Sequence, residues 1–572
     1  MLLSTMAERD ERREFADEEL SGPVVDRRTT MKLLGAAGMA GLAGCTGGGG
    51  GGDNGSGSGS DGAGSGGDSG NASGPPSEGQ TGGRLQAGWF TGSVEVLDPP
   101  YISVGQYFQL AANVFSGLVT LASDLSVRGD LANDWTVEDG GATYTFDLRE
   151  GVTFHNGEEF TAEDVRYTVR RTIEEETPAA GKFEGLQPID DGGVEIVDDY
   201  TVTLRWEEPN AAALVYLTRG PGRAGTIVNR TAIEEMGREQ YQVTPVGTGP
   251  FEVTDHNVGS GVTLDAYGEY FETDENGTQL PYLDGVDVRP IPEPASLVNA
   301  LRSGDIQFSN LVPLQNLDQL DGDPSVTADT APGINWYGFS MNQEREPFAS
   351  RQVRRGIAKL IDNEAFVQSA YFGNALPDTG IINKGTEWAW REDKPNDQDY
   401  APEEGQQLLA DAGADGASFS ILATESTLRQ AKAMRNQLNE TGFTVEIEQV
   451  TSSTYWERYE EGDYDTTISG SIIDPDPEQS LWNFYRLPEE DGVWNWVNYE
   501  KQEIHDLLGE QRRAVDRDRR TELLHRIEDT LIADAPSAYL VHQDDIAGVR
   551  EEVGGFQHIS GLRNLHTVFL DE

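Results

Sequence analysis

Strand-like and helix-like segments alternate between residues 418 and 470, and this alternation limits the fold more than any other feature of the chain. The segments lie at 418–423, 428–439, 443–448, 455–460 and 465–469. Consecutive βαβ units form a parallel sheet with helices on its faces, and ligands of such sheets bind beyond the carboxyl ends of the strands. The last strand leads into the loop 472–478, IIDPDPE, which we therefore predict to face a ligand.

A different pattern precedes this region. Residues 143–149 alternate with a period of two, which places Tyr144, Phe146 and Leu148 on one face of a strand. Residues 201–206 alternate in the same way. The capping-box sequence TAED at 161–164 predicts that a helix begins between the two strands. The sequence thus predicts a β-rich region before the βαβ region.

An export and anchoring signal is predicted in residues 26–45, DRRTTMKLLGAAGMAGLAGC. Arg27 and Arg28 precede a weakly apolar run that is too short to span a bilayer. The run ends at Cys45, which is the only cysteine of the chain. The pattern resembles a twin-arginine signal joined to a lipobox, in which the cysteine carries lipid. The alternative is an ordinary apolar helix that follows a chance pair of arginines.

The next segment, residues 46–83, consists almost wholly of Gly, Ser, Asp and Asn. Such a segment cannot bury enough apolar surface to offset its ordering entropy, so we predict a disordered tether. A Gly-rich coil of this length reaches roughly 30–35 Å. The tether would hold a folded body clear of a membrane surface.

Charge is the strongest compositional signal. The chain has 99 Asp and Glu residues against 42 Lys and Arg residues, which gives a formal net charge of −57. Acidity spread along the whole chain argues against nucleic acid as a partner. It predicts a surface adapted to a hypersaline medium, because molar salt shortens the Debye length to about 3 Å and removes the self-repulsion. An acidic protein of an ordinary medium is the alternative.

Seven short blocks follow one another in the folded part, at 97–99, 115–119, 130–135, 143–151, 154–165, 245–251 and 351–362. They include LDP, FSGLV, DLANDW, FHNG, FTAEDV and PVGTGPF. In this order they resemble the motifs of the extracellular solute-binding proteins of family 5, the peptide/nickel class that feeds ABC importers. Each block alone is weak, and their common order makes the resemblance specific.

The resemblance implies an α/β fold of the periplasmic-binding-protein type (class II), with two lobes, two crossover segments and a hinge between the lobes. About 490 residues follow the tether, which is enough for two or three lobes. We predict lobe 1 at 84–335, a β-rich subdomain inserted in it at about 126–195, lobe 2 at 336–535, and a return to lobe 1 at 536–572.

The resemblance also implies capture rather than chemistry. The lobes would close around a dipeptide or an oligopeptide, whose backbone would pair strand-like with the protein, and the closed form would deliver it to the permease of an ABC importer with its cytoplasmic ATPase. Oligosaccharides, nickel complexes and other small solutes stay alternatives, because the family uses one fold for all of them. The expected protein is a monomeric, halophilic lipoprotein on the outer face of the membrane, without cofactor or metal.

Candidate solute contacts lie in the ligand-facing loop and around the hinge. The resemblance aligns Asp476-Pro477 with the family's Asp-Pro, and Ile473 then stands where the family has the aspartate that holds a peptide's α-amine. We therefore predict contacts from Asp474 or Asp476, for which a solvated acidic turn is the alternative. The aromatic candidates, each of which is otherwise a core residue, are Trp336, Tyr337, Trp482, Trp494 and Trp496.

Two other classes of protein fit the sequence less well. An enzyme is disfavoured because the folded part contains no GxSxG, HExxH, P-loop or CxxC motif, and its histidines form no recognisable metal set. His155 lies in one of the family blocks and is expected to be a packed turn residue. A surface adhesin would favour internal repeats, and we find none in the sequence.

Overall fold

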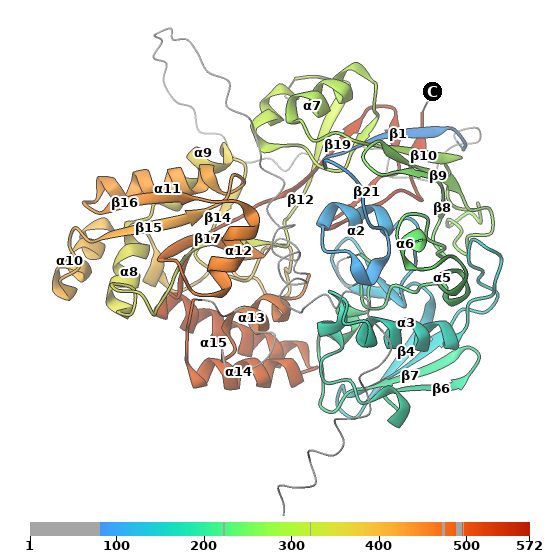
Figure 1. Ribbon diagram of the computed structural model, residues 1–572, viewed down its shortest axis with the longest axis horizontal. Coiled ribbons are helices and arrows are strands. Elements are labelled where there is room, and N and C mark those ends of the chain that lie inside the picture. Colours follow the sequence, from blue (N-terminus) through green and yellow to red (C-terminus); the bar gives the residue numbers. More distant parts are fainter. Residues whose placement is uncertain are drawn as a thin grey trace, which may run out of the picture.

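The computed structural model describes residues 81–220, 223–320, 322–471, 475–487, 495 and 497–571. Figure 1 shows two lobes side by side, with the blue and green lobe 1 on the right and the yellow and orange lobe 2 on the left. Arg27, Arg28, Cys45 and most of the tether lie outside the described residues. Among the described helices, none has the length and apolar character that a membrane crossing requires.

Lobe 1 is built on a seven-stranded sheet in the order β12-β19-β11-β1-β10-β9-β8. Strand β1 is parallel to both β10 and β11, and the other neighbours are antiparallel. Trp89, Phe115 and Phe251 are buried in its core. The strands are β1 (Arg84–Trp89), β8 (Phe251–Asn257), β9 (Gly261–Ala266), β10 (Gly285–Pro290), β11 (Phe308–Ser309), β12 (Val326–Ala331) and β19 (Asp545–Arg550).

Shorter elements complete lobe 1 around this sheet. They are β2 (Val119–Leu121), β3 (Val127–Gly129), β20 (Val553–Gly554), β21 (Gln557–Ile559), β22 (Leu562–Asn564), β23 (Phe569–Leu570), α2 (Gly105–Ala111), α4 (Ala213–Tyr216), α5 (Arg230–Met236), α6 (Arg238–Tyr241) and α7 (Pro294–Ser303).

The β-rich subdomain is a four-stranded antiparallel sheet in the order β4-β5-β7-β6, packed against helix α3 (Ala162–Glu174). Tyr144, Phe146 and Leu148 of β5 are all buried, which confirms the period-two prediction. The capping box of Thr161 and Asp164 is also confirmed. The sheet ends at Arg205 rather than near 195, because β7 pairs between β5 and β6. The strands are β4 (Ala132–Glu138), β5 (Thr143–Leu148), β6 (Val194–Asp198) and β7 (Thr201–Arg205).

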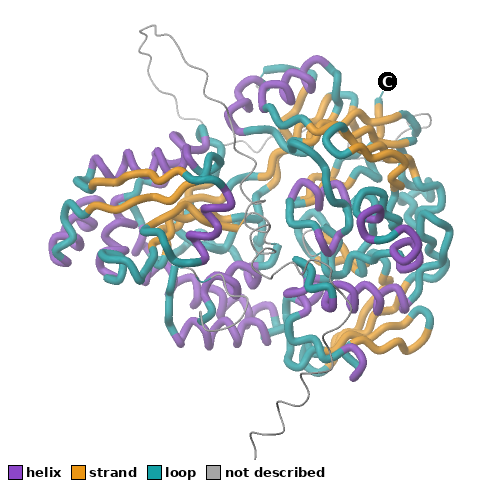
Figure 2. The backbone as a smooth tube through the Cα atoms, viewed as in Figure 1, coloured by secondary structure: helices purple, strands orange, loops and turns teal. Residues whose placement is uncertain are grey.

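Lobe 2 contains the predicted βαβ units. Strand β15 is parallel to both β16 and β17 in a six-stranded sheet of order β14-β18-β13-β17-β15-β16, and helices flank this sheet (Figure 2). The strands are β13 (Trp336–Met341), β14 (Leu376–Pro377), β15 (Ser418–Ala423), β16 (Thr444–Gln449), β17 (Thr466–Ser471) and β18 (Ser537–His542). The helices are α8 (Arg351–Leu360), α9 (Asn363–Tyr371), α10 (Pro402–Ala412), α11 (Leu428–Glu440), α12 (Ser452–Glu460), α13 (Pro477–Tyr485), α14 (Gln502–Arg513) and α15 (Arg517–Asp534).

Two short crossovers connect the lobes. The first runs from β12 of lobe 1 to β13 of lobe 2. The second runs from β18 to β19. Strand β18 pairs with β13 inside the lobe 2 sheet, so the chain returns to lobe 1 only after His542, and the predicted boundary at 536 is too early.

His155 is a packed turn residue that the fold requires in its neutral form. Its Nε2 lies 3.0 Å from the Gly249 carbonyl oxygen, and the Gly247 N–H donates to its Nδ1 at 3.3 Å. A second ring proton would therefore face an N–H donor. Burial lowers the pKa of His155 to about 4 from an ordinary value of 6.5.

This pKa shift predicts a pH dependence of stability. Between pH 6.5 and pH 4 the unfolded state binds a proton at His155 that the folded state does not, so stability falls as the pH falls through this window, by up to about 1.4 kcal/mol per pH unit from this group. Chemical denaturation at several pH values measures the slope. We expect the free energy of unfolding of His155→Gln to depend less steeply on pH, because the variant lacks the proton that His155 binds on unfolding. Equal slopes in the variant and the wild type would contradict the lowered pKa of His155.

Candidate functional site

The carboxyl edges of the two sheets meet at the crossovers. In lobe 2, Trp336 at the start of β13 pairs with Ser471 at the end of β17. In lobe 1, Asp545 at the start of β19 pairs with Ala331 at the end of β12, and β19 is antiparallel to β11. Lobe 1 has the parallel strands β1, β10 and β11, and lobe 2 has the parallel strands β15, β16 and β17. Each crossover therefore connects the carboxyl edge of the lobe 1 strands to the carboxyl edge of the lobe 2 strands. Because ligands of such sheets bind beyond these edges, the junction between the lobes is the candidate site.

The two crossovers are bonded to each other. The Asn335 side chain donates to the Gln543 carbonyl oxygen at 2.6 Å and accepts from the Gln543 N–H at 2.7 Å. His542 Nδ1 lies 2.6 Å from the Asn335 carbonyl oxygen. Gly333 passes so close that a Cβ atom there would lie 1.7 Å from the Gln543 carbonyl oxygen. The hinge is therefore a pair of crossover segments fixed side by side through Gly333, Asn335 and Gln543.

A buried ion pair lies directly behind the hinge. Lys394 Nζ donates to both carboxylate oxygens of Asp378 at 2.6 and 2.8 Å, and His542 Nε2 lies 3.3 Å from the same carboxylate. Burial alone would raise the pKa of Asp378, but His542 and Lys394 outweigh it and hold this pKa well below its usual range. The carboxylate stays charged and braces the end of β18 against β14.

The predicted loop residues lie only partly within the described residues. Asp474, Trp494 and Trp496 are outside them. Asp476 is 3 % exposed and caps α13 by accepting from the Glu478 N–H at 2.9 Å. Both of its oxygens also accept from Arg520, at 2.6 and 2.7 Å. Asp476 thus fixes the first turn of α13, and its contact with a solute stays a prediction.

Trp336 and Tyr337 enter lobe 2 directly after the first crossover, as predicted. The Trp336 indole is buried, donates to Ser480 Oγ at 3.0 Å and packs edge-on against Phe484 and Tyr539. Tyr337 lies 6.2 Å from Tyr371 between ring centroids, and burial raises the pKa of its phenol. Trp336 joins α13 to the sheet, and a role for either ring in solute stacking stays a prediction.

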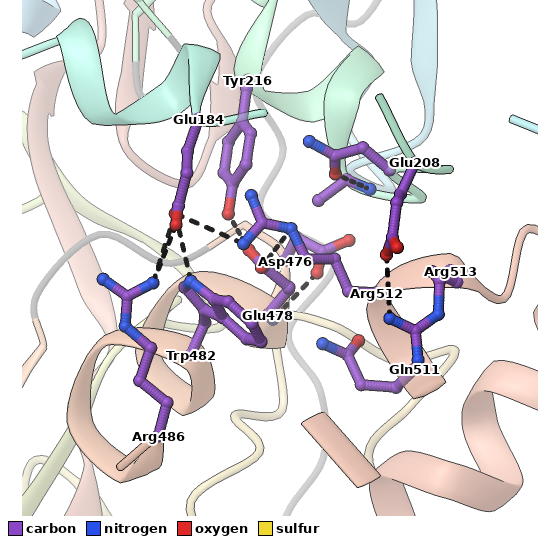
Figure 3. A network of polar contacts seen from close by, with 12 residues as sticks. Glu184, Glu208, Tyr216, Asp476, Glu478, Trp482, Arg486, Gln511, Arg512 and Arg513 are labelled. Carbon is purple, nitrogen blue, oxygen red and sulfur yellow. Dashed lines mark hydrogen bonds and ion pairs between the residues drawn. The ribbon is translucent and has the colours of Figure 1, made fainter. Parts of the chain in front are cut away.

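Trp482 lies where α13 contacts the subdomain of lobe 1 (Figure 3). Its Nε1 donates to Glu184 Oε2 at 3.2 Å. Arg486 and Arg512 of lobe 2 donate to the same carboxylate, at 3.0 and 3.3 Å. Burial alone would raise the pKa of Glu184, but the charges of Arg512 and Arg486 outweigh it and lower this pKa.

A second carboxylate bridges the lobes beside Glu184. Glu478, in the first turn of α13, is fully buried and accepts from the Tyr216 phenol of lobe 1. Lys182 of the subdomain lies 4.5 Å from the Tyr216 ring centroid and donates to Gln479 at 2.6 Å. These contacts hold α13 against lobe 1.

The sequence placed Glu478 in the predicted loop 472–478 but assigned it no contact, and it did not predict Glu184, Tyr216, Arg486 or Arg512 at all. Glu184 and Arg486 are 302 residues apart in the chain. A single glutamate also cannot be singled out in a sequence that contains 99 Asp and Glu residues. No local pattern could have identified this network.

Two other features of the described residues do not form a functional site. A cavity of about 620 Å³ lies on the subdomain between α3 and β6, and its lining includes Arg166, Arg170 and Arg205. Each of these arginines already pairs with a carboxylate. Within the described ranges, no group of three or more His, Cys, Asp or Glu side chains is placed to hold a metal ion.

Comparisons with known proteins agree with this geometry. Residues 126–491 match the model of the bacterial extracellular solute-binding proteins, family 5 (middle). The glutathione-binding protein GsiB of Shigella flexneri is 26% identical over 465 residues, which cover 78% of this chain and 86% of GsiB.

Solved structures show the same fold. The periplasmic binding protein DppA of Helicobacter pylori, in complex with the peptide STSA, superposes with a TM-score of 0.73 at 23% identity, over 86% of this chain and 99% of DppA. AgaA of A. tumefaciens R10, in complex with agropinic acid, superposes with a TM-score of 0.71 at 25% identity, over 86% of this chain and 99% of AgaA.

Proposed function

Because the chain belongs to the extracellular solute-binding proteins of family 5, we propose that it captures a short peptide between its two lobes and delivers it to the permease of an ABC importer. Proteins of this family bind substrates for ABC importers outside the cytoplasm and are not enzymes. The observation that carries the proposal is the meeting of the carboxyl edges of the two sheets at a hinge of two crossover segments. A solute bound there contacts both lobes, so its binding favours the closed form.

A peptide is the favoured solute. GsiB is named for glutathione and DppA was solved with a peptide, and both ligands carry peptide bonds and charged ends. Strand ends at the junction can pair with a peptide backbone, which gives affinity without demanding particular side chains. The agropinic acid complex of AgaA supports the alternative, in which the same junction binds another small solute. Oligosaccharides and nickel complexes belong to that alternative.

The N-terminal region supports a membrane-anchored form of this function. We propose that the twin arginines Arg27 and Arg28 direct export and that Cys45 carries the lipid. The segment 46–83 then acts as the tether, and the body works as a monomer at the outer face of the membrane. The net charge of −57 suits a medium of high salt, where the repulsion between carboxylates is screened.

Thermal-shift measurements in molar salt test the solute. We expect dipeptides to tetrapeptides and glutathione to raise the melting temperature, with a stabilisation of about 2.7 kcal/mol at a hundredfold excess over Kd. The N-acetylated form of the best peptide is the matched control, and we expect it to bind at least about tenfold more weakly, because it lacks the charged α-amine that an acidic loop would hold. Shifts with agropinic acid or sugars and none with peptides would overturn the peptide assignment and leave the fold unaffected.

A further inference from the structure

We propose that lobe 2 carries a carboxylate receptor, made of Trp482, Arg486 and Arg512, and that Glu184 of lobe 1 is the carboxylate that fills it when the lobes meet. The receptor and Glu184 together form a latch between the two lobes (Figure 3). The inference rests on the proposed function in one respect, which is that the lobes move relative to each other.

The geometry at Glu184 is that of a bound carboxylate. Its two oxygens accept from three donors of lobe 2, namely Trp482 Nε1 at 3.2 Å, Arg486 Nη1 at 3.0 Å and Arg512 Nη1 at 3.3 Å. Hydrogen bonds between ionised partners are about twice as strong as neutral ones. The lowered pKa of Glu184 is consistent with an ionised carboxylate in this position.

The receptor is assembled entirely from lobe 2. The Arg486 and Arg512 guanidinium carbons lie 5.0 and 4.5 Å from the Trp482 ring centroid, which is cation–π distance. Glu478 of lobe 2, which is buried at the junction, lies 3.6 Å from Arg512 Nε. These contacts do not involve Glu184, so the two cations stay side by side when lobe 1 moves away. A preformed pair of cations favours the return of an anion.

Burial of the two arginines distinguishes this latch from another ion pair across the same junction. The Arg486 and Arg512 side chains are 4 % and 13 % exposed, and the Glu184 side chain that they bind is 45 % exposed. In contrast, Arg513 and Glu208 pair at 3.0 Å with side chains 46 % and 70 % exposed. Water and salt screen the exposed pair, whose contribution is therefore small. Glu208 provides a matched control that removes the same charge from the same face of lobe 1.

The latch stabilises the closed form whether or not a solute is bound. A solute that binds the closed form then spends less of its binding free energy on closure, so its apparent affinity rises with the population of that form. Removal of the latch is expected to accelerate solute release, because the lobes reopen more often. The solute itself need not touch Glu184.

The test compares Glu184→Gln with Glu208→Gln in the full chain. With the best peptide from the thermal-shift series, we expect Glu184→Gln to raise the dissociation rate about tenfold, which corresponds to the loss of one or two charge-assisted hydrogen bonds. We expect less than a twofold change in Glu208→Gln. In the double variant Glu184→Gln/Arg486→Gln, the effect should not exceed that of the larger single change, since both substitutions break the same contact.

A second measurement needs no solute and separates this inference from the proposed function. Hydrogen–deuterium exchange of the α13 segment 477–485 in the ligand-free protein should be faster in Glu184→Gln than in the wild type, and unchanged in Glu208→Gln. Equal exchange in all three proteins would overturn the latch even if peptides bind. Faster exchange in Glu184→Gln alone would support it even if no peptide is found.

Discussion

Replacement of Arg520 by leucine is expected to lower the free energy of unfolding of lobe 2 by about 3–5 kcal/mol. The Arg520 side chain is 7 % exposed and forms two hydrogen bonds with Asp476, at 2.6 and 2.7 Å. Its Nε also donates to Gln511 at 3.2 Å. Leucine would leave the Asp476 carboxylate buried without its counter-ion, which costs more than the ion pair itself contributes. Chemical denaturation of the full chain measures the change.

The neighbouring residue supplies the control for this prediction. Arg519 pairs with Glu522 and Glu510, but its side chain is 50 % exposed. Arg519→Leu should therefore change stability by less than about 1 kcal/mol. The double variant Asp476→Asn/Arg520→Leu should recover part of the loss, because no charge is then left unpaired. Equal effects of the two single arginine variants would refute the structural role of the Asp476–Arg520 pair.

Replacement of Gly333 by alanine is expected to disable the hinge. A Cβ atom at this position would lie 1.7 Å from the Gln543 carbonyl oxygen and 2.4 Å from Asn335 Nδ2. No side-chain rotation relieves a clash between the Cβ atom and the Gln543 backbone carbonyl, so the two crossovers must separate and lose the Asn335–Gln543 hydrogen bonds. We expect peptide affinity to fall at least about tenfold, since one or more buried hydrogen bonds and the closed geometry are lost together.

Gly268→Ala is the matched control for the hinge variant. A Cβ atom at Gly268 would meet nothing within 4 Å, so this substitution should leave affinity and stability unchanged. Circular dichroism first shows whether Gly333→Ala is folded, and calorimetry with the best peptide then gives its affinity. A folded Gly333→Ala protein with wild-type affinity would show that the crossovers need not be held together.

Local sequence patterns predicted the elements of this fold well. The βαβ units of lobe 2 follow from segments that each specify one strand or helix, and β15, β16 and β17 pair as expected. The capping box at Thr161 and the buried face of β5 also depend on residues close in the chain. Such features are fixed by neighbours, so a single sequence is enough to find them.

The lobe boundary at the second crossover was wrong for a physical reason. Residues 537–542 are recognisable as part of the folded body, but their sequence does not say which sheet they join. That choice is made by pairing with β13, about 200 residues earlier, through contacts such as Gly338 with Tyr539. The end of the subdomain at Arg205 was missed for the same reason, because β7 is placed by its two partner strands.

In the candidate site, too, features set by neighbouring residues were predicted and features set by distant residues were not. The sequence located Trp336 near the hinge, because it follows a recognisable lobe boundary. It placed Asp476 in a loop, 472–478, whereas Asp476 caps a helix that begins at Pro477. It could not reveal that Asp476 binds Arg520, or that Glu184 meets Arg486 and Arg512, because these partners come together only when the domains pack. Because the chain contains so many Asp and Glu residues, the role of one carboxylate can be recognised only from the residue that it binds in the folded protein.

Small-angle X-ray scattering of the full chain, with and without the best peptide, tests the central claim most directly. The claim is that two lobes close around a solute at the junction of their carboxyl edges. We predict that a saturating peptide decreases the radius of gyration of the wild type and leaves that of Gly333→Ala unchanged. A wild-type radius that does not change when the protein is saturated with a tightly bound solute would contradict capture by closure.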